Sequence, residues 1–150
     1  MQGKFGLIVP PRENFFQIRL IIRWDGDGFV DEVFLRGMEF FGRHGVMPEE
    51  QVLGQRFVVH VRMEGDFRAA SESDELAQAV DYAKVFERVR ERVEGPPVRL
   101  LERLASLIAD DVLADWPTVA RVSVQVDKPG APIAGVFATA GVRVSRARAD

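Results

Sequence analysis

The clearest signal along the chain is an alternation of apolar and polar residues, which is typical of half-buried β-strands. It runs through Arg56–Glu64, Val119–Lys128 and Val136–Arg146. A further strand is expected over Val30–Phe40, where β-branched and aromatic residues dominate. On the strand that begins at Arg56, His60 falls on the polar face, so we expect its side chain to lie in solvent.

Two stretches between the strand pairs follow the three- and four-residue spacing of amphipathic helices. The first begins at Asp81, which can act as an N-cap, and ends at a Gly-Pro-Pro run; the second covers about Val98–Ala114. Before them lies the polar segment Asp66–Ala79, with the start of one short helical turn expected at Ser71. The order strand, strand, helix, helix, strand, strand predicts an α+β domain, an antiparallel four-stranded sheet with both helices on one face.

Composition narrows the function classes. With 150 residues, 47% of them hydrophobic, the chain fits one domain with its own core. It has no cysteine, which excludes disulfides, thiolate nucleophiles and cysteine-bound metal, and suits the cytoplasm. A formal net charge of -3 argues against a nucleic-acid partner, and no apolar run approaches the ~20 residues of a membrane span.

Residues 1–29 differ in character from the rest of the chain, with a Pro-Pro pair, a short apolar run and a flexible Asp-Gly repeat. We expect either an extra edge strand or a loosely ordered arm, and we place the domain itself at 30–150. A start of translation at Val30 is a further hypothesis for this region.

The loop Phe41–Gln55 carries an unusual set of groups between two predicted strands. It contains His44 and the adjacent carboxylates Glu49 and Glu50, within glycine and proline residues that impose turns. Loops of this kind often carry binding groups, but a solvated acidic loop is an equally good interpretation. From the residues alone, the two acids cannot be ranked.

Three residues elsewhere could carry chemistry. Tyr82, the only tyrosine, is predicted at the start of the first helix. Its side chain could act as a weak acid or as a stacking surface, or its ring could simply pack against the helix start. Glu102 lies in the first turns of the second helix, either as a surface acid or, facing a pocket, as an acceptor of two hydrogen bonds. Lys128 ends the apolar face of a strand before a proline-rich turn, and is either a proton shuttle or a lysine extending into solvent. The two histidines lack metal-binding spacing, so no metal is expected.

Six motifs in order make the chain from about Asp31 to Arg146 resemble dihydroneopterin aldolase of the folate pathway. The motifs are Leu35-x-Gly37-Met38-x-Phe40, Gly42-x-His44-Gly45-Val46 with Glu50 and Gly54-Gln55, Ser73-Asp74, Val80-Asp81-Tyr82, Leu100-Leu101-Glu102 with Leu104-Ala105, and Lys128-Pro129-x-Ala131-Pro132-Ile133 with Gly135.

The resemblance implies a T-fold subunit, a homo-oligomeric ring of four, commonly stacked as an octamer, and a retro-aldol cleavage of 7,8-dihydroneopterin without metal, Schiff base or other cofactor. It also implies roles for single residues. Lys128 corresponds to the catalytic lysine, Glu50 to the glutamate that holds the trihydroxypropyl chain, and Tyr82 to a catalytic tyrosine supplied by a neighbouring subunit. Glu102 corresponds to the anchor of the pterin ring, helped by backbone groups around Leu101 and Val80.

Two alternatives remain. A related epimerase acting on dihydroneopterin or its triphosphate shares the fold, the tyrosine and the lysine, but tends to lack the His-Gly pair and the Lys-Pro-x-Ala-Pro-Ile run that are present here. A non-catalytic pterin-binding module with this fold would not require the lysine, the tyrosine and both glutamates together.

Overall fold

The computed structural model describes residues 31–149, and the expectations for the preceding segment lie outside the described residues. Four antiparallel strands form one sheet in the order β1-β2-β3-β4. Their bounds are Asp31–Gly42 for β1, Gln55–Gly65 for β2, Val119–Lys128 for β3 and Ala140–Ala147 for β4. The strands lie in the sheet in the same order as in the chain. The longest connection is the one between β2 and β3.

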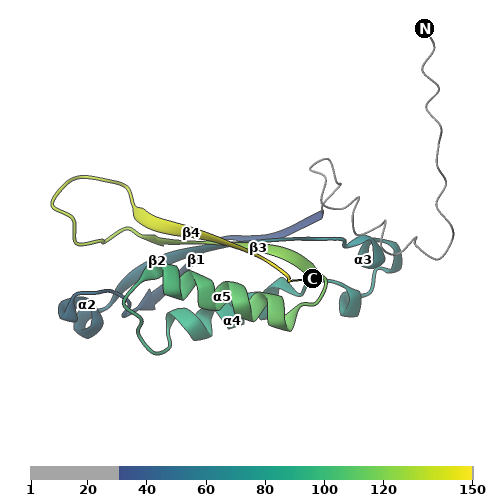
Figure 1. The fold of residues 1–150 in the computed structure, drawn as a ribbon, viewed down its shortest axis with the longest axis horizontal. Coiled ribbons are helices and arrows are strands. Elements are labelled where there is room, and N and C mark those ends of the chain that lie inside the picture. Colours follow the sequence, from purple (N-terminus) through teal and green to yellow (C-terminus); the bar gives the residue numbers. More distant parts are fainter. Residues whose placement is uncertain (1–30, 150) are drawn as a thin grey trace, which may run out of the picture. The chain divides into compact units, whose positions relative to one another are not determined.

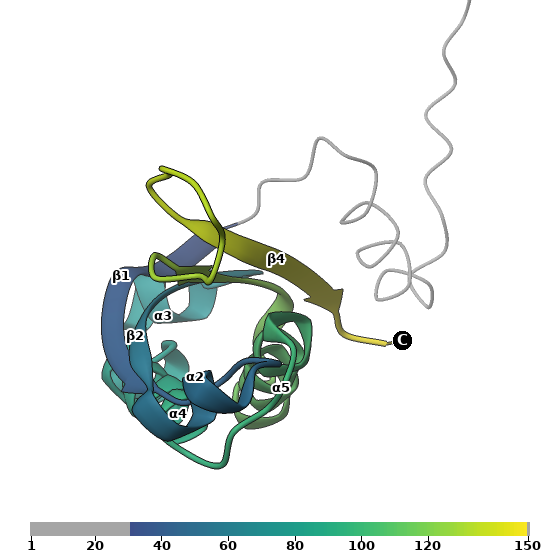
Figure 2. The same cartoon turned by 90° about the vertical axis from the view of Figure 1, so that its left-hand side faces the viewer.

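That connection carries the two main helices, α4 (Tyr82–Val93) and α5 (Leu101–Asp115). Both lie on one face of the curved sheet, and no helix of residues 31–149 covers the other face (Figures 1 and 2). Three short elements complete the described chain: α2 (Pro48–Leu53), α3 (Arg68–Ser73) and the 3-10 turn η2 (Leu76–Gln78). The predicted α+β architecture is therefore confirmed. None of the helices within residues 31–149 has the length and apolar character needed to cross a bilayer.

The core lies between the sheet and the two helices, because each element places its apolar positions toward the other layer. On β3, Val122, Val124 and Val126 are fully buried, as the alternation predicts. The helices contribute residues at three- and four-residue spacing, which are Val85, Val89 and Val93 from α4 and Leu104, Ala105, Ile108, Ala109 and Val112 from α5. Burial of these faces supplies the main driving force for the fold.

A β-bulge in β1 changes which residues face the core. The register of β1 against β2 shifts between Leu35 and Met38, and Gly37 has a φ of 75°, in the left-handed region. Beyond the bulge, Met38 and Phe40 are buried, although an unbroken alternation from Val33 would point them to the opposite face. The residue pattern predicts the strand but not this change of face.

Several predicted boundaries and placements are wrong in detail. The loop Phe41–Gln55 contains the helix α2, and its two ends belong to β1 and β2. The helical turn expected to start at Ser71 is instead the end of α3, capped by Asp74 in a left-handed conformation. The last strand begins at Ala140 rather than Val136. His60 does lie on the polar face, but its side chain is only 28% exposed and is hydrogen-bonded rather than solvated.

Candidate active site

Lys128, the last residue of β3, does not extend into solvent. Its Nζ forms an ion pair with Glu50 Oε2 from the first turn of α2, and the two side chains are only 9% and 10% exposed. The strand alternation directs Lys128 to the helix-covered side of the sheet, where it continues the row of buried valines. A pair of opposite charges buried this far loses most of its hydration, so it requires further hydrogen bonds.

Those hydrogen bonds are directed to the Glu50 carboxylate. Gln55 Nε2 donates to Oε2 at 2.9 Å, and the backbone N–H of Met47 donates to Oε1 at 3.4 Å. Burial alone would raise the pKa of Glu50, but the hydrogen bonds from Lys128, Gln55 and Met47 outweigh it, so the pKa lies below its ordinary value. Glu50 is thus held as a carboxylate, whereas its neighbour Glu49 is exposed.

Gly45 allows the loop to approach this carboxylate closely. A Cβ on Gly45 would lie 2.4 Å from the carboxyl carbon of Glu50, a distance that no other residue could accept without movement. The N–H of Gly45 donates to the carbonyl of Val98 at 3.0 Å, which ties the loop to the segment between α4 and α5. Gly45 therefore links the Glu50 side chain to the connection that precedes α5.

His44 secures the same connection from a fully buried position. The N–H of Val98 donates to His44 Nδ1 at 3.0 Å, so the ring proton resides on Nε2, which donates to the carbonyl of Val93 at 2.7 Å. Its ring also meets Phe57 edge-on, with 5.5 Å between centroids. Through these contacts His44 shapes the loop.

Glu102 and Leu101 lie at the same end of the molecule as the Lys128–Glu50 pair. Val98 connects the two parts of the site. Its backbone is hydrogen-bonded to His44 and Gly45, and it lies three residues before the start of α5. Glu102 is exposed in the first turn of α5, and Leu101 is half-buried beside it. Figure 2 faces this end, where α2 and the loop between β3 and β4 also lie.

Tyr82 and Val80 are not brought to this end. Helix α4 runs from Tyr82 to Val93, whose carbonyl contacts His44, so its first residue lies about 17 Å away along the helix axis. Asp81 caps that helix as predicted, accepting hydrogen bonds from the N–H groups of Ala83 and Lys84. Tyr82 is 61% exposed there, while Val80 is buried. Within one chain, these two residues and Lys128 belong to opposite ends.

One residue of this site had no role predicted from the sequence. Gln55 stands out only as part of a motif, yet it holds Glu50, and its buried Oε1 has no hydrogen-bond partner among the described residues. That motif, in which Gln55 follows Gly54, was the only signal in the sequence. No three His, Asp or Glu side chains between residues 31 and 149 gather as a group that could hold a metal ion.

The buried, neutral His44 makes the folded chain sensitive to mild acid. Burial lowers the pKa of His44 below 6.5, and the positive charge of Lys128 acts in the same direction. Between pH 6.5 and the lower folded pKa, the unfolded chain binds more protons, so the free energy of unfolding falls as the pH drops through this window.

We expect urea midpoints measured between pH 7.5 and 5.5 to fall more steeply for the wild-type chain than for His44→Gln. This window lies above the ordinary pKa of 4.5 of Glu50, whose depressed pKa keeps it ionised throughout. Parallel pH dependences of the two proteins would contradict the assignment of a buried neutral imidazole.

Comparisons with known proteins identify the family of this chain. The family profile of dihydroneopterin aldolase matches residues 33–145. A curated relative from Bacillus subtilis, named dihydroneopterin aldolase, is 41% identical over 117 residues, which are 78% of this chain and 98% of that protein.

Solved structures give the same result. The Escherichia coli dihydroneopterin aldolase in complex with neopterin superposes with a TM-score of 0.71 at 34% identity, covering 77% of this chain and 98% of that one. The Burkholderia enzyme bound to guanine has a TM-score of 0.66 at 27% identity, with coverage of 80% and 93%. The predicted T-fold architecture is thereby confirmed, and the chain belongs to the dihydroneopterin aldolase family.

Proposed function

We propose that this protein cleaves 7,8-dihydroneopterin by a retro-aldol reaction to 6-hydroxymethyl-7,8-dihydropterin and glycolaldehyde, in the cytoplasm, as a step of folate biosynthesis. The observation that carries the proposal is the buried ion pair of Lys128 with Glu50, formed by two of the family's motif residues at one end of the sheet. The family match and the relatives at about 40% identity support the same reaction.

The substrate itself supplies the electron sink for this reaction. The N5=C6 imine of the dihydropterin is conjugated with the bond that breaks, so neither a metal ion nor a lysine Schiff base is required. The protein must then position the side chain of the substrate and move protons. Lys128 acts at the hydroxyl group and at N5 through a water molecule, and the Glu50 carboxylate holds the trihydroxypropyl chain.

Recognition of the ring falls to Glu102. The amino group and ring N–H of a pterin present two parallel donors, which a carboxylate can accept together. Glu102 is exposed at the start of α5, where its carboxylate is available to a ligand and favoured by the helix dipole. Backbone groups around Leu101 complete this part of the pocket, and the relative solved with neopterin supports a pterin ligand.

The position of Tyr82 favours a site that is shared between subunits. Tyr82 begins α4 and Val80 lies two residues before it, at the end of the helix remote from Val93 and His44, which supports a site to which a second chain contributes both residues. Strands β1 and β4 are the edges of the described sheet, and pairing of β1 with β4 of a neighbour would continue it. We propose a homo-oligomeric ring of four subunits, stacked as an octamer.

Replacing the lysine tests the catalytic assignment. For Lys128→Ala we expect kcat for glycolaldehyde release to fall by about 100-fold to 10,000-fold, the usual range for the loss of a proton-transfer group. Lys84→Ala, at an exposed position of α4, is the matched control and should keep the wild-type rate. Full activity in Lys128→Ala would remove this residue from the mechanism.

Replacing the anchor tests recognition of the ring. Glu102→Gln keeps the shape but loses the charge and one acceptor, so we expect pterin affinity to fall by about tenfold to a hundredfold, equivalent to ~1 to 3 kcal/mol. Equilibrium titration with neopterin measures it directly. Glu49→Gln, an exposed acid in α2, serves as the control, and equal affinity in both variants would refute the anchor role.

Mixing two inactive variants tests the shared site. Tyr82→Ala and Lys128→Ala damage different sides of the proposed interface, so hybrid rings contain some sites with both residues intact. Random assembly should restore about one quarter of the wild-type activity. If co-expressed hybrids stay as inactive as the separate variants, Tyr82 does not act across a subunit boundary.

A further inference from the structure

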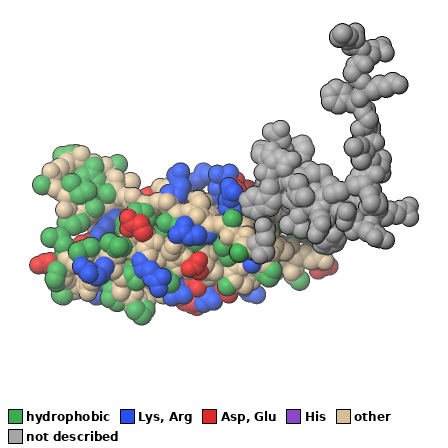
Figure 3. Space-filling view, in the orientation of Figure 1, with side chains coloured by type: hydrophobic (Ala, Val, Ile, Leu, Met, Phe, Trp, Pro, Cys, Tyr) green, Lys and Arg blue, Asp and Glu red, His purple; other side chains and the backbone are tan. Residues whose placement is uncertain are grey.

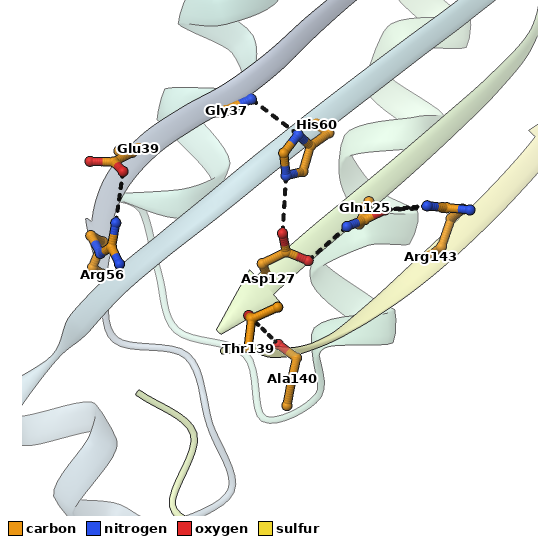
Figure 4. Close-up of polar contacts among 9 residues, drawn as sticks. All are labelled: Gly37, Glu39, Arg56, His60, Gln125, Asp127, Thr139, Ala140 and Arg143. Atoms are coloured by element: carbon orange, nitrogen blue, oxygen red, sulfur yellow. Dashed lines mark hydrogen bonds and ion pairs between the residues drawn. The ribbon is translucent and has the colours of Figure 1, made fainter. Parts of the chain in front are cut away.

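A continuous chain of hydrogen bonds crosses all four strands on the face of the sheet that the helices leave uncovered, here called the open face (Figure 4). It runs from the N–H of Gly37 on β1 to His60 on β2, then to Asp127 and Gln125 on β3, and ends at Arg143 on β4. In Figure 3, basic side chains lie along the upper edge of the molecule, where the strands run, and also over the part below it. The proposed reaction uses none of the side chains in this network.

The hydrogen bonds at His60 have a defined donor and acceptor at each ring nitrogen. The N–H of Gly37, in the β1 bulge, donates to His60 Nδ1 at 3.0 Å. Because that nitrogen accepts, the ring proton lies on Nε2, which donates to Asp127 Oδ2 at 3.0 Å. His60 therefore connects the bulge of β1 to the carboxylate on β3.

Asp127 is held from three strands. Besides the bond from His60 on β2, Gln125 Nε2 donates to Asp127 Oδ1 at 2.9 Å, and Arg143 Nε on β4 donates to Gln125 Oε1 at 3.1 Å. Gly141 on β4 packs so closely that a Cβ there would lie 2.9 Å from Asp127 Oδ1. The carboxylate has little freedom, which its 14% exposure reflects.

Asp127 directly precedes Lys128 at the end of β3. Consecutive residues of a strand point to opposite faces, so Asp127 is fixed on the open face while Lys128 points toward Glu50 on the other side. Beyond Lys128 the chain leaves the sheet in a turn, where the carbonyl of Lys128 accepts from the N–H of Ala131. The last anchored side chain before the lysine is therefore Asp127.

We propose that Asp127 and His60 are positioning residues for Lys128, an inference that rests on the catalytic role of Lys128 proposed above. Their hydrogen bond on the open face fixes the end of β3. It thereby sets the direction from which the Lys128 ammonium group, on the helix-covered face, approaches Glu50 and the substrate. Small displacements of a reacting group cost rate rather than ligand affinity, because the pterin ring is held elsewhere.

An exposed ion pair on the same face provides the contrast. Arg56 on β2 bonds Glu39 on β1 at 2.7 Å, but both side chains are more than half exposed, and their contact does not reach β3 (Figure 4). Exposed ion pairs of this kind contribute little to the stability of the fold. Glu39→Gln is thus a matched control that alters polar contacts on the open face without touching the anchor of Asp127.

Two substitutions of His60 separate its two hydrogen bonds. His60→Asn keeps an acceptor near the Nδ1 position for Gly37 but loses the donor to Asp127, whereas His60→Gln keeps a donor near the Nε2 position and loses the acceptor. Each loses one hydrogen bond, so their stabilities should be similar. If the contact with Asp127 positions Lys128, only His60→Asn lowers kcat, by about tenfold or more, while its KM for 7,8-dihydroneopterin stays at the wild-type value.

The result that would overturn the positioning role is a wild-type kcat in His60→Asn, or an equal loss in both His60 variants. Should His60→Asn fail to fold, Asp127→Asn applies the same test, because a single amide oxygen cannot accept from both His60 and Gln125 in the present geometry. A lowered kcat at unchanged KM supports the role, and wild-type kinetics refute it.

Lys128→Ala, measured in parallel, keeps the two proposals apart. An inactive Lys128→Ala beside a fully active Asp127→Asn would refute only the positioning network. A fully active Lys128→Ala would refute the role of the lysine itself.

Discussion

The buried contact between Lys128 and Glu50 is the interaction on which the rest of this structure depends. Removing an ammonium and a carboxylate from water costs several kcal/mol per ion, and their attraction offsets this cost only when further hydrogen bonds complete the site. Gln55 and the N–H of Met47 supply them. A hydrophobic pair would fill this space without that desolvation cost, which supports the catalytic roles proposed for the two charges.

Much of the surrounding architecture can be understood as support for this contact. From the loop side, Gly45 permits the close approach of Glu50, and His44 fastens the loop to the segment that leads into α5. On the strand side, β3 delivers Lys128 as the last member of a row of buried residues, with Asp127 bound on the opposite face. The same connection that His44 fastens places Glu102, the proposed ring anchor, at this end.

Regular periodicity made much of the fold predictable. The strict alternation of β3 correctly directs Lys128 to the covered side, and Asp81 correctly marks the start of α4. Irregular features were not predictable. The bulge at Gly37 moves the burial pattern by one residue with no signal beyond a glycine, and α2 is too short to show a helical period. Preference for Glu50 over Glu49 came from the resemblance, since only tertiary contacts distinguish adjacent acids.

The placement of Tyr82 marks a different limit, because in the proposed shared site the residues that complete it come from two chains. Its separation from Lys128 follows from the length of α4 once the fold is known. Metal-independent cleavage can be measured by incubating the purified protein with 7,8-dihydroneopterin in the presence of a chelator and quantifying the glycolaldehyde released. Release at a rate unaffected by the chelator is the predicted result, whereas no release, or release only after added metal, would contradict it.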